Sequence, residues 1–164
     1  DILPSAGMDQ AQVRPLRWPN WYLNASQVQR FFADVPFVGL YARIRRYIWR
    51  ELARRSYRAI EEWGDSIWRS RCVCVVSPIV MDCLRWPNTF FVPDDLCELL
   101  FWDASPELLS VEATYRIAKM LGLSADVVNP RAGITYGDFI DGIVSHLFDS
   151  FGEMGSGGAG DAVP

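Results

Sequence analysis

Residues 107–147, which read ELLSVEATYRIAKMLGLSADVVNPRAGITYGDFIDGIVSHL, predict two amphipathic helices joined by a loop rich in turn residues. In the first helix, apolar residues recur with helical spacing at Leu108, Val111, Tyr115, Ala118 and Leu121, with Leu109 and Ile117 beside them. We expect this stripe to be buried in a hydrophobic core. Lys119 falls in the last turn and Gly122 follows it, and both residues are signals that end a helix.

The second predicted helix has a clear N-terminal signal. Its apolar positions are Ile134, Phe139, Ile140, Ile143, Val144 and Leu147. Thr135 is a favoured N-cap residue, and Asp138 stands three residues later, where a capping box has Glu or Gln. The carboxylate of Asp138 also lies near the positive end of the helix dipole. The pattern therefore predicts a helix that starts directly after Thr135.

This stretch and the residues before it resemble the acyl carrier protein family. The shared pattern is LLSVE, an apolar helix that ends in LGL, a loop with Pro, Asn and Asp, and the segment ITYGDFIDGIV. Upstream, residues 91–100, FVPDDLCELL, look like the long loop that leads into the second carrier helix. The resemblance covers residues 72–148 and implies an all-α, acyl-carrier-like helical bundle.

The resemblance also implies where a cofactor and partners would bind. It places Glu107 at the serine that carries 4'-phosphopantetheine in the family, and a carboxylate cannot be phosphorylated as a serine hydroxyl can. We therefore predict a non-catalytic, acyl-carrier-like protein without a cofactor, which acts through protein–protein interaction. The alternative is a genuine carrier with 4'-phosphopantetheine on Ser105. A partner-docking surface is implied at Asp103, Glu107 and Glu112, and an ordinary solvated surface is the other interpretation.

Ahead of the bundle, residues 36–63 predict one long basic amphipathic helix. Its apolar positions include Leu40, Ile44, Tyr47, Ile48, Leu52 and Ile60. The opposite face carries Arg43, Arg46, Arg50, Arg54 and Arg58. This N-terminal extension either docks its apolar stripe on the bundle as an ordinary solvated helix, or offers the first four of these arginines as a partner-binding surface.

The arginine face is suited to acidic partners of several kinds. Anionic lipid headgroups, nucleic acid and an acidic protein are the candidates. The net charge of −4 and the absence of lysine from the helix argue against nucleic acid. Residues 1–71 carry twelve Arg against seven Asp or Glu, whereas residues 72–164 carry four basic and thirteen acidic residues. A protein partner is therefore predicted, an anionic membrane surface is a further alternative, and an undocked apolar stripe would favour a homodimer.

Composition divides the chain into four parts. We predict a flexible tail over residues 1–15, a helical extension over 16–71, the carrier-like bundle over 72–148 and a Gly-rich disordered tail over 149–164.

Three local predictions concern the joints between these parts. The aromatic residues Trp18, Trp21 and Tyr22 should pack on the body of the protein. Asn24 or Ser26 can cap a short helix over residues 27–33. Residues 72–76, CVCVV, fit a strand by composition, but no second strand is available to pair with it. We favour a helix for this part of the chain, from about Pro78 or slightly earlier to Trp86.

Several function classes are disfavoured by what the chain lacks. No apolar run reaches the roughly 18 residues that span a bilayer, and no signal peptide is visible, so we predict a cytoplasmic protein with reduced cysteines. The only zinc ligands would be Cys72, Cys74 and His146, whose spacing does not fit the common sites, so no metal is predicted. No nucleophile-elbow, P-loop or dinucleotide pattern is present, and we predict that the protein is not an enzyme.

Overall fold

The computed structural model of the chain describes residues 13–26, 39–55, 60–103 and 108–155. In these ranges it contains six α-helices, one 3-10 helix and no strand longer than an isolated bridge, so the prediction of an all-α bundle is confirmed. The helices are α1 (Asn20–Leu23), α3 (Gly39–Ala53), the 3-10 helix (Ile60–Trp63), α4 (Ile67–Leu84), α5 (Cys97–Leu100), α6 (Leu109–Leu121) and α7 (Tyr136–Gly155). None of the described helices is long and apolar enough to cross a membrane.

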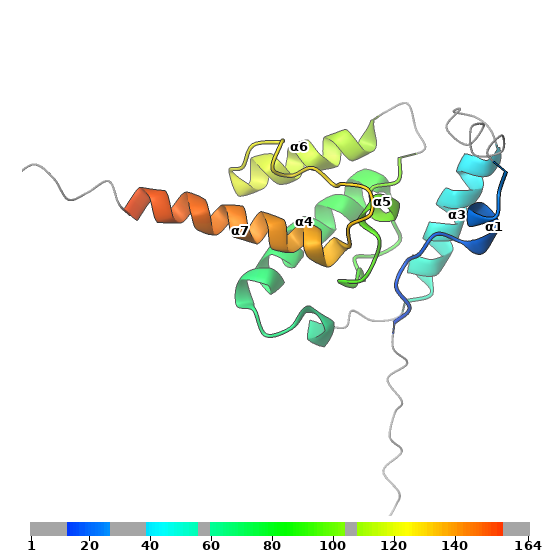
Figure 1. The fold of residues 1–164 in the computed structure, drawn as a ribbon, viewed down its shortest axis with the longest axis horizontal. Helices are drawn as coiled ribbons and strands as arrows, with labels where there is room; N and C mark the ends of the chain where they lie inside the picture. The colour runs from blue at the N-terminus through cyan, green and yellow to red at the C-terminus, as the bar shows by residue number, and fades with distance from the viewer. Residues whose placement is uncertain (1–12, 27–38, 56–59, 104–107, 156–164) are drawn as a thin grey trace, which may run out of the picture.

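Helix α4 is the one around which the bundle is built. It makes its most extensive helix contacts with α6 and the next most extensive with α7. Its buried residues are Cys72, Val73, Val76, Ser77, Ile79, Val80, Cys83 and Leu84. In Figure 1, α1 and α3 lie at one end of the molecule and α7 extends toward the other. The molecule is therefore elongated, with the basic helix α3 far from the free end of α7.

The bundle consists of two helix–loop–helix units, α4 with α5 and α6 with α7. Their loops meet in an isolated antiparallel bridge between Leu96 and Thr135. Two residues after Thr135, Gly137 N donates a hydrogen bond of 2.7 Å to Pro93 O. A Cβ atom on Gly137 would lie only 3.1 Å from that same carbonyl oxygen. The first turn of α7 is therefore fixed directly against the backbone of the first loop.

Helix α4 resolves the ambiguous segment 72–76 in favour of helix, as predicted. The helix starts earlier than predicted, at Ile67, because Ser66 Oγ accepts a hydrogen bond of 3.4 Å from Arg69 N as an N-cap. It also runs without a break through Pro78. Pro78 is exposed, so the carbonyl group that loses its helical donor faces the solvent side of the helix.

Helix α3 is shorter than predicted. Its apolar residues Ile44, Ile48 and Leu52 are fully buried, as expected. The helix ends at Ala53 rather than at residue 63, however, because Arg55 turns inward and becomes buried. Arg58, which we assigned to the basic face, lies outside the described residues.

Helix α6 buries a face that only partly overlaps the predicted one, since Ala118 of the predicted stripe is buried together with the neighbouring Leu109 and Ile117. The buried residues are Leu109, Ala113, Ile117 and Ala118. Leu108, Val111 and Tyr115, which we expected in the core, are 62%, 57% and 62% exposed. The helix is apolar on two sides, and the side with the smaller alanines packs against α4. The prediction for its end is confirmed, since Gly122 adopts a φ of 69° as the C-cap.

Helix α7 begins as predicted. Asp138 N donates to Thr135 Oγ1 at 3.1 Å, and Thr135 N donates to Asp138 Oδ2 at 3.0 Å, which completes a capping box. The hydrogen bonds from Thr135 lower the pKa of Asp138. The helix continues to Gly155, where we predicted a disordered tail from residue 149. The predicted helix over 27–33 lies outside the described residues.

Candidate interaction surfaces

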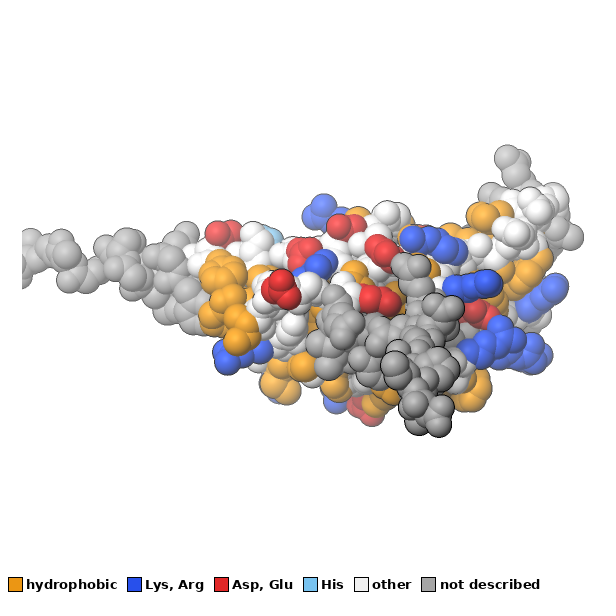
Figure 2. Space-filling view, turned by 90° about the horizontal axis from the view of Figure 1, so that it is seen from below, with side chains coloured by type: hydrophobic (Ala, Val, Ile, Leu, Met, Phe, Trp, Pro, Cys, Tyr) orange, Lys and Arg blue, Asp and Glu red, His pale blue; other side chains and the backbone are white. Residues whose placement is uncertain are grey.

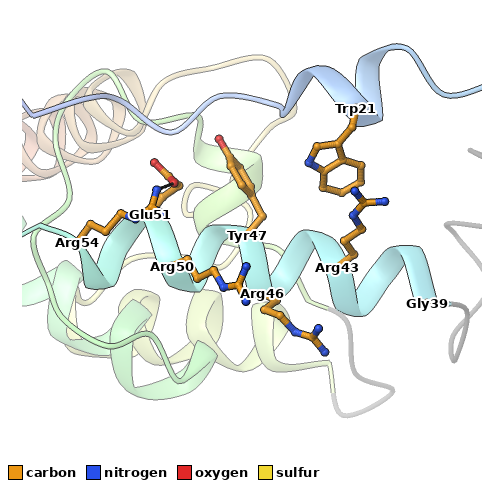
Figure 3. A pocket seen from close by; sticks show the side chains of 8 residues that line it. All are labelled: Trp21, Gly39, Arg43, Arg46, Tyr47, Arg50, Glu51 and Arg54. Carbon is orange, nitrogen blue, oxygen red and sulfur yellow. Dashed lines mark hydrogen bonds and ion pairs between the residues drawn. The ribbon is translucent and has the colours of Figure 1, made fainter.

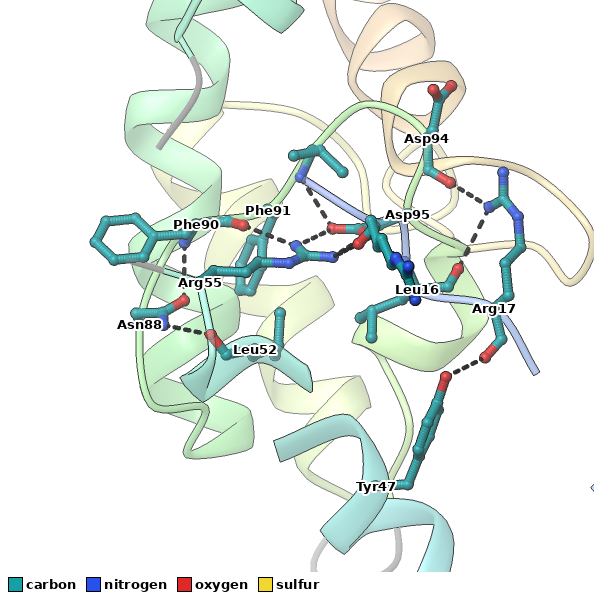
Figure 4. Close-up of polar contacts among 12 residues, drawn as sticks. Leu16, Arg17, Tyr47, Leu52, Arg55, Asn88, Phe90, Phe91, Asp94 and Asp95 are labelled. Atoms are coloured by element: carbon teal, nitrogen blue, oxygen red, sulfur yellow. Dashed lines mark hydrogen bonds and ion pairs between the residues drawn. The ribbon is translucent and has the colours of Figure 1, made fainter. Parts of the chain in front are cut away.

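A buried ion pair joins the N-terminal segment and the end of α3 to the bundle (Figure 4). Arg55 donates from Nη2 to Asp95 Oδ1 at 2.6 Å and from Nη1 to Asp95 Oδ2 at 2.7 Å. Leu16 N donates to Oδ1 at 2.7 Å, and Val92 N donates to Oδ2 at 2.9 Å. We call these four residues the Asp95 clasp. Because both carboxylate oxygens are saturated by donors from three segments, the clasp fixes α3 relative to the bundle.

An aromatic cluster fastens α1 to the same end of the molecule. Trp18, Trp21 and Tyr22 all pack against the core, as predicted. The Trp18 ring stacks on Tyr22 at a centroid distance of 4.5 Å and meets Trp102 edge to face at 5.3 Å. These contacts place Trp21 beside the outward face of α3.

The outward face of α3 carries the predicted arginines as one row (Figure 3). We define the arginine row as Arg43, Arg46, Arg50 and Arg54, all of which are exposed. Together with Gly39, Trp21, Tyr47 and Glu51 they line an open depression of about 540 Å³.

The four arginines differ in how they are held. The Arg43 guanidinium lies 4.3 Å from the centre of the Trp21 ring, and Arg54 Nη1 lies 2.7 Å from Glu51 Oε1. No described residue forms a hydrogen bond or an ion pair with Arg46 or Arg50. The centre of the row therefore carries two guanidinium groups with unused donors.

The predicted acidic docking residues lie elsewhere, at the start of α6. Asp103 is half-buried, and its Oδ2 accepts a hydrogen bond of 3.1 Å from Ser110 N, which holds the first turn of α6. Glu112 is exposed, and its Oε1 lies 3.9 Å from Arg116 Nη1. Glu107 and Ser105 lie outside the described residues. Asp103 and Glu112 therefore border the same helix, and the structure does not bring them together with the arginine row on α3.

An apolar groove that the sequence did not predict opens between α4 and α7. It encloses about 340 Å³ and is lined by Trp68, Arg71, Cys72, Val75, Leu121, Val144, Leu147 and Phe148. Trp68 and Phe148 meet edge to face at 5.4 Å and remain 48% and 50% exposed. Figure 2 shows one patch of hydrophobic side chains near the end of the molecule to which α7 extends. We call this feature the α4–α7 groove.

The α4–α7 groove was missed because its two walls are far apart in the sequence. The signal that could have indicated it is the pair of large aromatic residues, Trp68 at the start of α4 and Phe148 in the second half of α7. Burial raises the pKa of Cys72, which lines the groove, to about 12. Its thiol is therefore neutral and behaves as part of an apolar wall. None of the four cysteines, which all lie in the described residues, forms a disulfide bond.

The loop between α6 and α7 has the frame of a metal site but not the donors. A helix–loop–helix unit is the frame of the calcium-binding EF-hand, whose loop supplies several carboxylate ligands. Here the loop carries one carboxylate, Asp126, and one cation, Arg131, while Asp138 is used in the capping box. Among the described residues, no group of three or more His, Cys, Asp or Glu could hold a metal ion. This donor set does not fit calcium.

Comparison with protein-family models, with curated proteins and with solved structures finds no match to the chain. The resemblance to acyl carrier proteins therefore stays a prediction that rests on the sequence pattern alone.

Proposed function

We propose that the protein is a non-catalytic interaction protein that binds the apolar face of a partner's amphipathic helix in the α4–α7 groove. The observation that carries this proposal is the groove itself, in which two large aromatic residues, Trp68 and Phe148, are about half exposed. Large aromatic residues at the centre of a contact supply much of its binding energy. An amphipathic helix reaches such a groove with side chains at positions i, i+3, i+4 and i+7.

The charge at the groove indicates the chemistry of this partner helix. Arg71 is the charged residue among those that line the groove, and its guanidinium lies 5.7 Å from the centre of the Trp68 ring. The remaining lining atoms belong mainly to aliphatic and aromatic side chains. A partner helix should therefore present an apolar stripe with Asp or Glu at its edge, opposite Arg71.

A displayed library of amphipathic helical peptides, selected on the purified protein, tests this proposal. Enriched peptides should share large apolar residues at helical spacing and an acidic residue at the edge of the stripe. Phe148→Ser should weaken the best peptide about thirty-fold, since truncation of a hot-spot residue costs about 2 kcal/mol. Met120→Ser is the matched control, because Met120 is 66% exposed and does not line the groove.

The charge at the groove gives a second test within the same selection. Arg71→Glu should change the preferred edge residue of the selected peptides from acidic to basic. The proposal fails if no peptide family is enriched, or if the selected peptides bind the Phe148→Ser protein as tightly as the wild type.

The alternative of a genuine acyl carrier stays open to a direct measurement. It is supported by the sequence pattern that surrounds Ser105, not by any described contact of that residue. Mass spectrometry after incubation with a phosphopantetheinyl transferase and coenzyme A should show no added mass if the non-catalytic proposal holds. Detection of a 4'-phosphopantetheine group on Ser105 would refute the non-catalytic proposal and support the carrier function instead.

A further inference from the structure

We propose that the arginine row of α3 is a peripheral binding site for phosphate groups at the surface of an anionic phospholipid bilayer. The site is separate from the α4–α7 groove, since α3 lies at the opposite end of the molecule from the free end of α7 (Figure 1). The inference goes beyond the proposed helix-binding function and does not depend on it.

The first argument is the geometry of the row. Arg43 and Arg54 are eleven positions apart, so the row extends about 16 Å along the helix at a rise of 1.5 Å per residue. The opposite side of α3 is fully buried through Ile44, Ile48 and Leu52. The arginines therefore lie on the solvent side of the helix, along one open depression.

The second argument is the availability of donors. Two arginines outside the row use their donors within the protein. Arg45 Nη2 donates to Leu84 O at 2.5 Å, and Arg55 Nη1 donates to Phe90 O at 2.7 Å. Arg46 has no such bond to any described residue, and the same holds for Arg50. A guanidinium group binds phosphate oxygens through two parallel hydrogen bonds, which an ammonium group cannot do in the same way. The free donors at the centre of the row match phosphate oxygens as acceptors.

The third argument is the arrangement of aromatic residues around the row. Trp49 is 46% exposed on one flank, and Tyr47 with Trp21 borders the other. Trp and Tyr favour the headgroup level of a bilayer. A protein–protein interface has the reverse arrangement, with an apolar centre and a polar rim. The row, which has charge at its centre and aromatic residues at its edges, fits a lipid surface better than a protein.

The same aromatic residues disfavour single-stranded nucleic acid. Such ligands need ring faces on which bases can stack along a basic groove. One face of the Trp21 ring is covered by the Arg43 guanidinium at 4.3 Å. The Tyr47 hydroxyl group donates a hydrogen bond of 3.0 Å to Arg17 O, which holds its ring in place. The depression at the arginine row therefore lacks a series of aromatic rings on which successive bases could stack.

The fourth argument is the separation of charge along the molecule. Residues 1–71 carry five more positive than negative charges, and residues 72–164 carry nine more negative than positive. In Figure 2, Lys and Arg side chains gather toward the end where α3 lies. A negatively charged bilayer attracts this end and repels the other, so it orients the protein with α3 toward the lipid. Since the apolar side of α3 is buried, attachment rests on charge and is sensitive to salt.

Vesicle flotation with the purified protein tests this inference. The protein should float with vesicles of mixed phosphatidylcholine and phosphatidylglycerol at low salt, and should stay behind with phosphatidylcholine alone. The Arg46→Gln/Arg50→Gln variant should bind the mixed vesicles about thirty-fold more weakly, from the usual contribution of each arginine near an anionic surface. Its circular dichroism spectrum and urea midpoint should match the wild type, because no described residue forms a hydrogen bond or an ion pair with either side chain.

A matched control separates the row from net charge. Lys119→Gln/Arg131→Gln removes the same two positive charges from exposed positions outside the row, and should reduce vesicle binding by less than about three-fold. Equal losses in the two variants would overturn the inference. So would a wild type that floats equally with neutral vesicles, or not at all.

Soluble probes distinguish the source of the phosphate and the class of ligand. Inorganic phosphate should displace the protein from vesicles no better than chloride at equal ionic strength. Displacement by low phosphate concentrations would assign the row to a free phosphate ligand instead. Tight, row-dependent binding of a single-stranded oligonucleotide or a polyglutamate peptide, without vesicle binding, would likewise overturn the bilayer assignment.

Discussion

Replacement of Asp95 by Asn should be among the most damaging single changes in the chain. The substitution keeps the shape of the side chain but removes its charge and turns one acceptor into a donor. Oδ1 faces Leu16 N and Arg55 Nη2, while Oδ2 faces Arg55 Nη1 and Val92 N. Either orientation of the amide therefore directs its NH2 group at two other donors, so an amide flip cannot relieve the conflict.

The expected size of this effect follows from burial. Arg55 is 8% exposed and Asp95 is 0% exposed, so the variant leaves an uncompensated guanidinium inside the protein. Breaking a buried ion pair from one side costs about 3–5 kcal/mol. Since the free energy of unfolding of a domain is about 5–15 kcal/mol, the Asp95→Asn variant should be marginally stable or unfolded at 37 °C.

Urea denaturation followed by circular dichroism measures the effect against a neighbouring control. Asp94→Asn removes a carboxylate one residue away, and the recorded contact of Asp94, from Arg17, is to its backbone oxygen. This control should change the free energy of unfolding by less than about 0.5 kcal/mol. In the double variant Arg55→Met/Asp95→Leu, the loss should be smaller than the sum of the single losses. A difference below about 1 kcal/mol between Asp95→Asn and Asp94→Asn would refute the reasoning.

Three further predictions concern the bundle. Ile117→Ala should lower the free energy of unfolding by about 2–5 kcal/mol and Tyr115→Ala by less than about 0.5, and equal effects in urea denaturation would contradict the observed face of α6. Gly137→Ala should cost about 1–3 kcal/mol in the same assay, because the new Cβ meets a backbone oxygen at 3.1 Å that cannot move freely, and a neutral result would show that the loop yields. With iodoacetamide, Cys74 should react in the native protein, whereas Cys72, buried and with a pKa near 12, should react only on unfolding, as peptide mass mapping would reveal.

The parts of the fold that the sequence predicted correctly are those fixed by neighbouring residues. Thr135 and Asp138 stand three positions apart, and their reciprocal hydrogen bonds need nothing from the rest of the chain. Gly122 ends α6 in a left-handed backbone conformation that glycine adopts with the least strain. The arginine row was also predictable, since charge at helical spacing opposite an apolar stripe indicates a solvent-facing side.

The errors come from choices that only tertiary contacts decide. Helix α6 is apolar on two sides, and periodicity does not say which side meets α4. The end of α3 depends on Arg55, whose partner Asp95 lies forty residues further along the chain. The α4–α7 groove likewise lies between helices that are far apart in the sequence, so no local sequence pattern predicts it. Of the two candidate interaction surfaces, the sequence therefore predicted the arginine row but not the α4–α7 groove.

The Asp95 clasp has a consequence for the order in which the chain becomes native. The Leu16 amide reaches its acceptor across 79 positions, which makes this one of the least local hydrogen bonds in the molecule. A contact that closes so long a loop gains its free energy only after the intervening segments are in place. The Leu16 amide should therefore exchange its hydrogen for deuterium as slowly as the middle of α4, even though the residues on either side of it are not fully buried.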